Sequence, residues 1–358
     1  MLRFEHINIR GFKSIERLED FALGQLNVLI GANGAGKSNF VEFFRLLGAI
    51  RQRRLRAYME RNAPADGYFY KGIKQTRRLE AALDFGMGKR YSFWLEPTAD
   101  GGVLIGDATD YRGPGGQSPE VGHAYPVNDR ESQSASFWMA PGVPDWQVYH
   151  FHDTSATAGM RREAGVDQAE ALAPNGDNLA AFLLALRAHH GESYQLLRQT
   201  VQRVMPHFDD FDLRKRDGKN EELVRLTWRQ KGSDYIFQPG HLSDGTLRFI
   251  CLATALLQPN PPATAVFDEP ELGLHPEALV ILAGLFRSAS ARMQIIVATQ
   301  SPVLLNEFEV ADVITVDNVQ GATQFNRLDK EALRQWLEDY TLGDLWQKGT
   351  LRGGVNHA

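Results

Sequence analysis

The sequence has a single cysteine, Cys251, among its 358 residues. One thiol cannot form an intramolecular disulfide, so a disulfide-stabilised secreted scaffold is excluded and a reducing compartment is favoured. No apolar run approaches the ~20 residues of a membrane span, and the first residues lack the apolar core of a signal peptide. We therefore expect a cytoplasmic protein with no membrane partner, in which Cys251 is a small core residue.

The chain also lacks an excess of positive charge. It has 39 Lys and Arg against 44 Asp and Glu, a formal charge of 39 − 44 = −5. A global basic field that attracts nucleic acid is therefore absent, although a local basic groove remains compatible with this balance. Internal repeats and heptad runs are missing too, so no coiled-coil arm is expected.

What the chain does contain is a glycine-rich turn, GANGAGKS at 31–38, between the apolar run LNVLI and the helix-like run NFVEFF. This pattern is typical of a P-loop, in which backbone N–H groups and a helix N-terminus surround phosphate oxygens. Lys37 is expected to reach the β- and γ-phosphates of ATP, and the Ser38 hydroxyl to ligate Mg²⁺. A turn that binds nothing is the alternative, but all eight positions fit the pattern. The residues expected around the nucleotide are Asn33, Gly34, Ala35, Gly36, Lys37, Ser38 and Asn39.

A second motif follows the apolar run 263–267, which ends in Asp268-Glu269-Pro270-Glu271. A P-loop enzyme needs acids at the end of a neighbouring strand. Asp268 is expected to hold Mg²⁺, directly or through water, and Glu269 to orient and deprotonate the attacking water. The alternative is an acidic pair at an ordinary turn.

Buried strand-like runs alternate with helix-like runs along much of the chain. This alternation predicts an α/β fold with a mainly parallel core sheet. Period-two alternation in 79–110 predicts an antiparallel lobe, and Asp217-Gly218 predicts a hairpin turn. The Gly, Pro, Ser and Gln content of 112–136 predicts a flexible loop, and 331–340 is expected to be a helix.

The order of the motifs resembles the ABC-type ATPases of the RecF, SMC and OLD group. The resemblance rests on GANGAGKS, on LSDGT at 242–246 and on FDEPELGLHP at 267–276. It extends from GFKS at 11–14 to LGDLW at 342–346 and is strongest to the small AAA family ATPases without coiled coils. It implies a P-loop NTPase built as a single ABC-type head over 1–358. Its expected parts are a nucleotide-binding core (1–50 and 240–330), the antiparallel β lobe (79–110), the loop (112–136), a helical and hairpin signature lobe (177–237) and a C-terminal helix and tail (330–358).

The resemblance also implies a shared active site. Ser243, Asp244 and Gly245 would form the signature that touches the γ-phosphate held by an opposite subunit, and His275 would lie in a loop that crosses the dimer interface. One subunit would then lack a complete site. ATP would join two copies head to tail in a homodimer with one two-fold axis.

Three departures from the wider family pattern affect this interpretation. Asp244 replaces the glycine of transporter-type proteins, which argues against transport. Gln300 stands where many relatives have a switch histidine; as a catalytic candidate it can hydrogen-bond phosphate or water but cannot usefully accept a proton, so turnover is expected to be slow. His152 and Asp153 lie where a glutamine-containing sensor loop is expected. They are either the γ-phosphate and Mg²⁺ sensor or packing residues at a strand end, and two ligands do not fill a zinc site.

No second active site follows Asp312, so the chain resembles the ATPase half of a split system. By resemblance, the partner would be a separately encoded TOPRIM-like nuclease in anti-phage defence. The aromatic-rich segment 336–346 would either dock that partner or seal the core. Two alternatives remain: a RecF-like repair clamp on double-stranded DNA, and a nucleotide-gated scaffold with negligible turnover. For the clamp, the DNA-contacting candidates are Arg51, Arg53, Arg54, Arg56, Lys71, Lys74, Arg77 and Arg78, which can equally be a solvated face.

Overall fold

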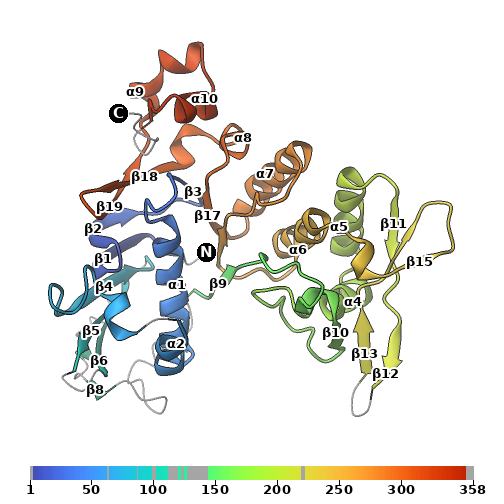
Figure 1. Cartoon of the computed structure of the whole chain (residues 1–358), viewed down its shortest axis with the longest axis horizontal. Coiled ribbons are helices and arrows are strands. Elements are labelled where there is room, and N and C mark those ends of the chain that lie inside the picture. The colour runs from blue at the N-terminus through green and yellow to red at the C-terminus, as the bar shows by residue number, and fades with distance from the viewer. Residues whose placement is uncertain are drawn as a thin grey trace. The chain divides into compact units, whose positions relative to one another are not determined.

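The structure is a computed structural model that describes residues 3–62, 64–86, 88–98, 102–111, 120–121, 125–126, 144–218 and 222–351. The chain divides into two compact units, each assembled from separate stretches of sequence (Figure 1). Unit 1 comprises Met1–Val148, Pro262–Val266 and Met293–Ala358, and unit 2 comprises Tyr149–Pro261 and Phe267–Arg292. In the described residues, no helix has the length and apolar character needed to cross a membrane.

A six-stranded sheet in the order β19-β18-β3-β17-β16-β9 forms the core of unit 1. β3 pairs in parallel with both β17 and β18, while β19 pairs antiparallel with β18. Every residue of β3 and β17 is buried, as expected for strands covered on both faces. The strands are β3 (Leu26–Ile30), β9 (Trp146–Tyr149), β16 (Thr264–Asp268), β17 (Gln294–Thr299), β18 (Val313–Val319) and β19 (Ala322–Arg327).

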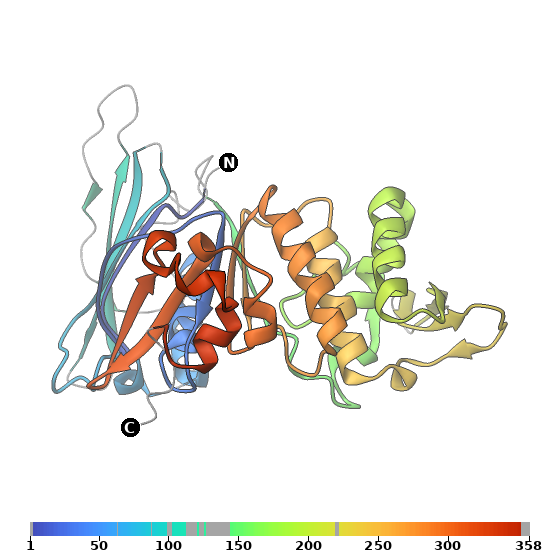
Figure 2. The same ribbon diagram turned by 90° about the horizontal axis from the view of Figure 1, so that it is seen from above.

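The second sheet of unit 1 is antiparallel and runs β2-β1-β4-β5-β6-β7, with β8 paired to β6 (Figure 2). The antiparallel lobe predicted over 79–110 is confirmed, and the sequence patterns did not show that the first two strands join it. Most of the expected loop 112–136 lies outside the described residues, which there comprise β7 and β8. The strands are β1 (His6–Phe12), β2 (Ile15–Ala22), β4 (Leu79–Asp84), β5 (Lys89–Pro97), β6 (Val103–Tyr111), β7 (Glu120–Val121) and β8 (Tyr125–Pro126).

The P-loop helix α1 (Lys37–Arg51) lies between these two sheets. On one side Phe40 packs on Phe325 of β19, with ring centroids 5.2 Å apart. On the other side Phe43 stacks on Phe93 of β5 at 6.3 Å. The aromatic faces therefore hold the helix that begins at Lys37 in a fixed place. Two short helices follow, α2 (Leu55–Asn62) and the 3₁₀ turn η1 (Ala65–Tyr68).

The C-terminal part of unit 1 is built from short helices. The single helix expected over 331–340 is wrong: α9 and η5 replace it, and neither has a buried residue. Without an apolar face to bury, a helix of that length is not stable. By contrast Leu342, Leu345 and Trp346 are buried, so this part of the tail seals the unit, whereas Trp336 is 48% exposed. The elements are α8 (Pro302–Leu305), η4 (Val310–Asp312), α9 (Lys330–Leu333), η5 (Trp336–Glu338) and α10 (Leu342–Gln347).

Unit 2 combines four helices with two three-stranded antiparallel sheets, β10-β13-β12 and β11-β14-β15. The hairpin predicted at Asp217-Gly218 is confirmed as β12 paired with β13. All residues of α6 from Leu247 to Leu257 are buried, Cys251 included. The elements are η2 (Gly159–Arg161), β10 (Glu163–Gly165), α4 (Leu179–His189), α5 (Gly191–Val204), β11 (Phe208–Phe211), β12 (Lys215–Asp217), β13 (Glu222–Arg225), β14 (Trp228–Gln230), β15 (Ile236–Phe237), η3 (Pro239–His241), α6 (Asp244–Leu257) and α7 (Pro276–Ser290).

Candidate nucleotide-binding site

The glycine-rich turn of unit 1 has the backbone that its sequence predicts. Gly34 and Gly36 have positive φ angles of 77° and 113°, which glycine adopts without steric cost. A Cβ on Gly36 would also clash with the side chain of Thr323, and one on Gly31 with the backbone of Val316. The β18–β19 hairpin therefore backs the turn and leaves room only for glycine at these positions.

Three side chains fasten this turn from behind. Asn39 Nδ2 donates to Ser14 Oγ at 2.6 Å, Ser14 Oγ lies 2.6 Å from Thr323 Oγ1, and Thr323 Oγ1 donates to the Ala35 carbonyl at 3.0 Å. Because the hydroxyl hydrogen of Thr323 goes to Ala35, Ser14 must donate to Thr323. The hydrogen bonds therefore run from Asn39 through Ser14 and Thr323 to the Ala35 carbonyl, which accepts the last one. Asn39 therefore takes part in the support of the loop, and its expected contact with the nucleotide remains a prediction. Neither Ser14 nor Thr323 was predicted.

Lys37 is 4% exposed. Its ammonium donates to the Gly31 carbonyl at 2.6 Å and the Ala32 carbonyl at 3.1 Å, so the charge is held inside the loop. The first turn of α1 has no acidic residue and no side-chain cap. In contrast, Ser243 caps α6 and His275 caps α7. The N-terminus of α1, with Ser38 in its first turn, is thus arranged to accept an anion.

Gln300 leaves the core sheet next to this loop. Thr299 of β17 pairs with Ile30 of β3 in a parallel register, so the next residues, Gln300 and Gly31, emerge side by side from the same sheet edge. Ser301 then caps α8 by accepting from the Leu304 amide at 3.1 Å. A side chain at position 300 is therefore placed at the edge from which the P-loop starts.

The two acids follow one another at the end of β16, in unit 2. Asp268 is 8% exposed, and Glu269 has a φ of +45°. A non-glycine residue in the left-handed region costs about 1–3 kcal/mol, and such strain concentrates at functional sites. The backbone of Glu269 is therefore held in an unfavourable conformation where the sequence predicts the catalytic base.

His152 and Asp153 have different local roles. His152 Nε2 lies 2.9 Å from the Asp268 carbonyl oxygen, and because a carbonyl only accepts, the hydrogen is on Nε2. Asp153 Oδ1 accepts from the Ser155 amide at 3.0 Å, and hydrogen bonds from the Ser155 side chain and then from this amide lower the pKa of Asp153. His152 therefore contacts the backbone of the acid segment, whereas Asp153 stabilises its own turn. Within the described ranges, no group of three or more His, Cys, Asp or Glu residues is arranged to hold a metal ion.

The signature residues begin α6. Ser243 Oγ accepts from the Thr246 amide at 3.1 Å, and Asp244 is the first residue of the helix. A Cβ on Gly245 would clash with the Gly273 carbonyl oxygen, so only glycine fits this close approach. The signature turn thus packs directly on the loop that follows Glu269, within unit 2.

His275 is the N-cap of α7, with Pro276 at the first position of the helix. Its Nδ1 accepts from the Glu277 amide at 3.4 Å. His275 therefore begins a helix in this structure. A role for His275 at a dimer interface remains a prediction.

Two arginines of the predicted basic cluster, Arg51 at the end of α1 and Arg56 on α2, have partners inside the protein. The Arg51 guanidinium lies 5.3 Å from the ring of Trp146. Arg56 pairs with Glu60 at 2.9 Å along α2. The ring contact favours a packing role for Arg51, whereas the pair of Arg56 is exposed and contributes little to stability. DNA contact by the cluster remains a prediction.

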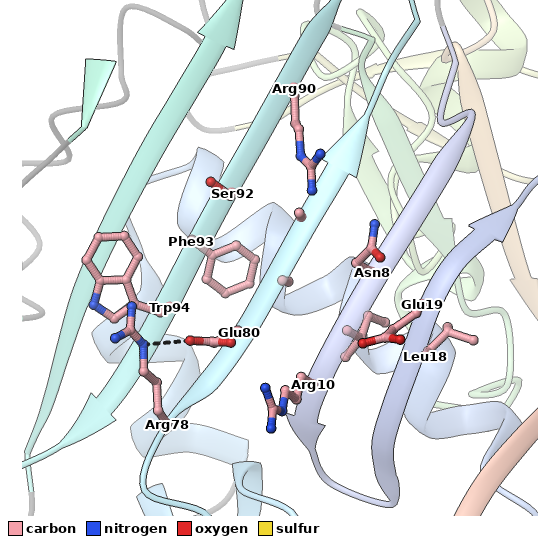
Figure 3. Close-up of a pocket in the computed structure, with 13 residues that line it drawn as sticks. Asn8, Arg10, Leu18, Glu19, Arg78, Glu80, Arg90, Ser92, Phe93 and Trp94 are labelled. Carbon is pink, nitrogen blue, oxygen red and sulfur yellow. Dashed lines mark ion pairs between the residues drawn. The ribbon is translucent and has the colours of Figure 1, made fainter. Parts of the chain in front are cut away.

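A pocket that the sequence analysis missed lies on the antiparallel sheet of unit 1 (Figure 3). Its volume is about 340 Å³, and it is lined by outward-facing residues of β1, β4 and β5 such as Arg10, Arg90 and Ser92. Arg78 pairs with Glu80 at 3.0 Å and covers the Trp94 ring at 4.7 Å. None of the motif residues lines this pocket.

Residues 26–306 match the model of the family described as "AAA domain, putative AbiEii toxin, Type IV TA system". One similar solved structure is an SMC head bound to the C-terminal winged-helix domain of ScpA, at 15% identity and a TM-score of 0.61, covering 93% of this chain and 99% of that one. Another is an Smc head with an extended coiled coil bound to the C-terminal domain of ScpA derived from Pyrococcus furiosus, at 16% identity and a TM-score of 0.56, covering 95% and 99%. The likeness confirms the predicted P-loop NTPase fold of the SMC-head type. A search of curated proteins found no match.

Proposed function

This chain belongs to the AAA domain family of the putative AbiEii toxins, an ABC-type ATPase family, and from that premise we propose that it binds and hydrolyses ATP with Mg²⁺. The observation that supports the proposal most directly is the N-terminus of α1, which has no side-chain cap, together with the Lys37 ammonium, which is held inside the loop by the Gly31 carbonyl. That arrangement suits a phosphate chain. The hydroxyl of Ser38 and the carboxylate of Asp268 are the hard oxygen donors that Mg²⁺ prefers.

In this proposal each residue has a defined task. The loop amides and Lys37 bind the β- and γ-phosphates, with Asn33, Gly34, Ala35 and Gly36 shaping the cradle. Glu269 orients the attacking water and takes its proton, and Gln300 hydrogen-bonds the γ-phosphate or that water. Bound Mg²⁺ supplies charge neutralisation at the phosphate oxygens. His152 senses the position of the Asp268-Glu269 segment, because its ring donates to the Asp268 carbonyl.

We further propose that ATP joins two copies into a head-to-tail dimer. Ser243 and Asp244 are exposed at the start of α6, where a helix N-terminus can approach an anion held by another molecule. Each nucleotide would then lie between the P-loop of one copy and the signature of the other. Closure on ATP and opening after hydrolysis would make the protein a switch.

The switch is proposed to act on a separately encoded effector, a TOPRIM-like nuclease, in anti-phage defence. The family description, which names a toxin of a toxin–antitoxin system, agrees with a defence context. The two similar SMC heads are each bound to a protein domain, ScpA, which agrees with heads of this fold acting through a partner. Double-stranded DNA would be a second ligand of the closed dimer.

The deciding experiment is the solution mass of Glu269→Gln protein, measured by light scattering with and without ATP and Mg²⁺. The chain has a mass of 40.1 kDa, and we expect it to double only with nucleotide, because the substituted protein retains its phosphate contacts but lacks the base. Lys37→Ala in the same background is the control and should stay monomeric. A mass independent of ATP, or unchanged hydrolysis by Glu269→Gln, would contradict the proposal.

Gln300 favours one alternative, a nucleotide-gated scaffold with negligible turnover, because an amide cannot accept the proton that a histidine could. Measurements on the unsubstituted protein distinguish the ATPase switch from the scaffold. ATP-dependent dimerisation without phosphate release by the unsubstituted protein would indicate the scaffold. Restoration of phosphate release by Gln300→His would then identify position 300 as the limiting residue.

A further inference from the structure

A buried arginine outside the recognised motifs holds the signature turn in place. Arg161 is 8% exposed. Its Nη2 donates to Asp244 Oδ1 at 2.8 Å, both Nη atoms donate to the Leu242 carbonyl at 3.2 Å, and Nη1 also donates to the Pro239 carbonyl. Its Nε donates to the Thr154 carbonyl at 2.9 Å. All five N–H donors of the guanidinium are thereby used.

A second arginine, Arg248 on α6, donates to backbone carbonyls outside the signature turn. Its Nε donates to the Phe151 carbonyl at 2.9 Å and its Nη2 to the His152 carbonyl at 3.1 Å. Its Nη1 donates to the Leu272 carbonyl, in the turn just after Glu269. Arg248 is also 8% exposed. Its bonds tie the signature helix to the turn that follows the acids.

Both arginines donate hydrogen bonds to the segment 151–154. Thr154 accepts from Arg161, Phe151 and His152 accept from Arg248, and the His152 ring donates to the Asp268 carbonyl. All of these groups belong to unit 2. A shift of the Asp268 backbone would therefore displace the 151–154 segment and, through Arg161, the signature turn.

We propose that Arg161 is a positioning residue for the signature turn and that residues 151–154 couple this turn to the acid end of β16. The proposal rests on the proposed function, since it assumes that the signature serves a nucleotide held by a second copy. Arg161 does not itself touch nucleotide. It fixes Leu242 and Asp244, so that Ser243 and the α6 N-terminus face outward in one orientation. The position of the Asp268 backbone in one copy's active site would thereby determine how the signature turn of that copy is oriented toward the nucleotide held by the second copy.

Only a guanidinium can make this set of contacts. A lysine ammonium keeps the charge but is a point donor, and it cannot reach Thr154, Leu242 and Asp244 together. Arg161→Lys should therefore loosen the signature turn without removing the positive charge. The hydrogen bonds of Arg161 go to Thr154, Pro239, Leu242 and Asp244, and none goes to the P-loop or to Asp268, so binding of nucleotide by a monomer should change little.

The test uses the full chain carrying Glu269→Gln and follows the dimer fraction against ATP concentration by light scattering. We expect Arg161→Lys to raise the ATP concentration for half-dimerisation about tenfold, which corresponds to losing one charged hydrogen bond. The Kd for a fluorescent ATP analogue, measured on dilute monomer, should change less than about twofold. Arg198→Lys is the matched control, because Arg198 donates to the Asp209 carbonyl at 2.6 Å and carboxylate at 2.8 Å in the same unit; it should change neither quantity.

Asp244→Asn keeps the test decisive if Arg161→Lys fails to fold. The Asp244 side chain is 68% exposed, so its substitution does not threaten the core. It removes the charged partner of Arg161, and the half-dimerisation concentration should rise in the same direction, by about threefold. Dimerisation by both variants at the parent's ATP concentration would overturn the proposal. An increase in the nucleotide Kd as large as the increase in the half-dimerisation concentration would also overturn the proposal.

A double-substitution cycle tests the coupling itself. His152→Ala and Arg161→Lys interrupt the same path, so their combined effect on half-dimerisation should be smaller than the product of the single effects. Effects that multiply would overturn the coupling. If the Glu269→Gln parent stays monomeric with ATP, the proposed function and this inference both fail. If the parent dimerises and the Arg161 and Asp244 variants dimerise equally well, only the inference fails.

Discussion

Gly245 of the signature turn and Gly273 of the loop after Glu269 approach each other so closely that no side chain fits between them. Gly273 has a φ of 72°, which presents its carbonyl oxygen to Gly245. Because both residues lie in unit 2, the contact sets the distance between the signature turn and the segment that carries Glu269. The small size of Gly245 is therefore a packing requirement as well as part of a motif.

Gly245→Ala should destabilise the protein by about 1–3 kcal/mol, because the new methyl group must displace backbone and not a flexible side chain. It should also reduce ATP-dependent dimerisation by shifting the start of α6. Thermal unfolding and light scattering measure the two effects. Gly284→Ala is the matched control: it lies in α7, has open space around its Cβ position, and should be neutral or stabilise by about 0.5–1 kcal/mol. Equal behaviour of the two alanine variants would contradict the packing argument.

Thr323→Val should weaken ATP binding although residue 323 is outside every motif. Valine has a similar shape but cannot donate to Ala35 or accept from Ser14, so the support behind Gly36 is lost. We expect a several-fold higher Kd for ATP and a stability loss of about 1–2 kcal/mol. Thr254→Val is the control, since Thr254 is buried and donates to the Ile250 carbonyl at 2.7 Å in α6. It should lower stability while the Kd measured by titration calorimetry stays constant.

Lys37→Ala and Ser243→Arg should separate nucleotide binding from closure. Loss of the Lys37 ammonium removes a charged contact to phosphate, so both the affinity for ATP and the dimer should fall, the affinity by about tenfold or more. Ser243→Arg places a bulky side chain on the exposed signature turn and should leave monomer affinity within about threefold while abolishing the dimer. Fluorescent-nucleotide titration and light scattering report the two quantities. A Ser243→Arg protein that still dimerises would exclude the signature from the interface.

The parts of the site that could be predicted are those encoded by contiguous residues. The turn 31–38 and the start of α6 each depend on a short string whose local backbone is set by its own glycines and caps. The pair Asp268-Glu269 is encoded by its place at the end of a short apolar strand. The backbone at all three sites agrees with the sequence patterns. That agreement does not test the catalytic roles, which remain proposals.

The parts that were missed depend on pairing between distant segments. Ser14 and Thr323 are 309 residues apart in the chain, and Arg161 is 83 residues from Asp244. No spacing rule reports such pairs, because they form only after the sheets assemble. The same limit applies to the bond between Asn39 and Ser14, which no local pattern indicated; the phosphate contact expected of Asn39 remains a prediction. The expected helix over 331–340 was wrong because its apolar residues have no surface to pack on.

Glu42 on the P-loop helix provides a pH prediction. Burial alone would raise the pKa of Glu42, but hydrogen bonds from Tyr58 and Arg45, with Lys13 nearby, outweigh it and lower this pKa below its ordinary value of 4.5. A carboxyl whose pKa is depressed in the folded state contributes stability above its unfolded pKa and loses it as pH falls through the folded value. The protein should therefore lose stability as pH is lowered below about 4.5.

Glu42→Gln should reduce the dependence of the free energy of unfolding on pH in the acid range. The reason is that a glutamine amide does not titrate, so protonation at position 42 no longer weakens the bonds to Tyr58 and Arg45. At neutral pH the same variant should be less stable, since Arg45 loses the carboxylate that accepts its 2.9 Å bond. Glu60→Gln is the control, because Glu60 is 66% exposed in its pair with Arg56, and exposed pairs contribute little. Urea unfolding at several pH values between 3 and 7 measures the slopes. A Glu42→Gln protein with the parent's slope would show that other carboxylates, and not the cluster on α1, determine acid unfolding.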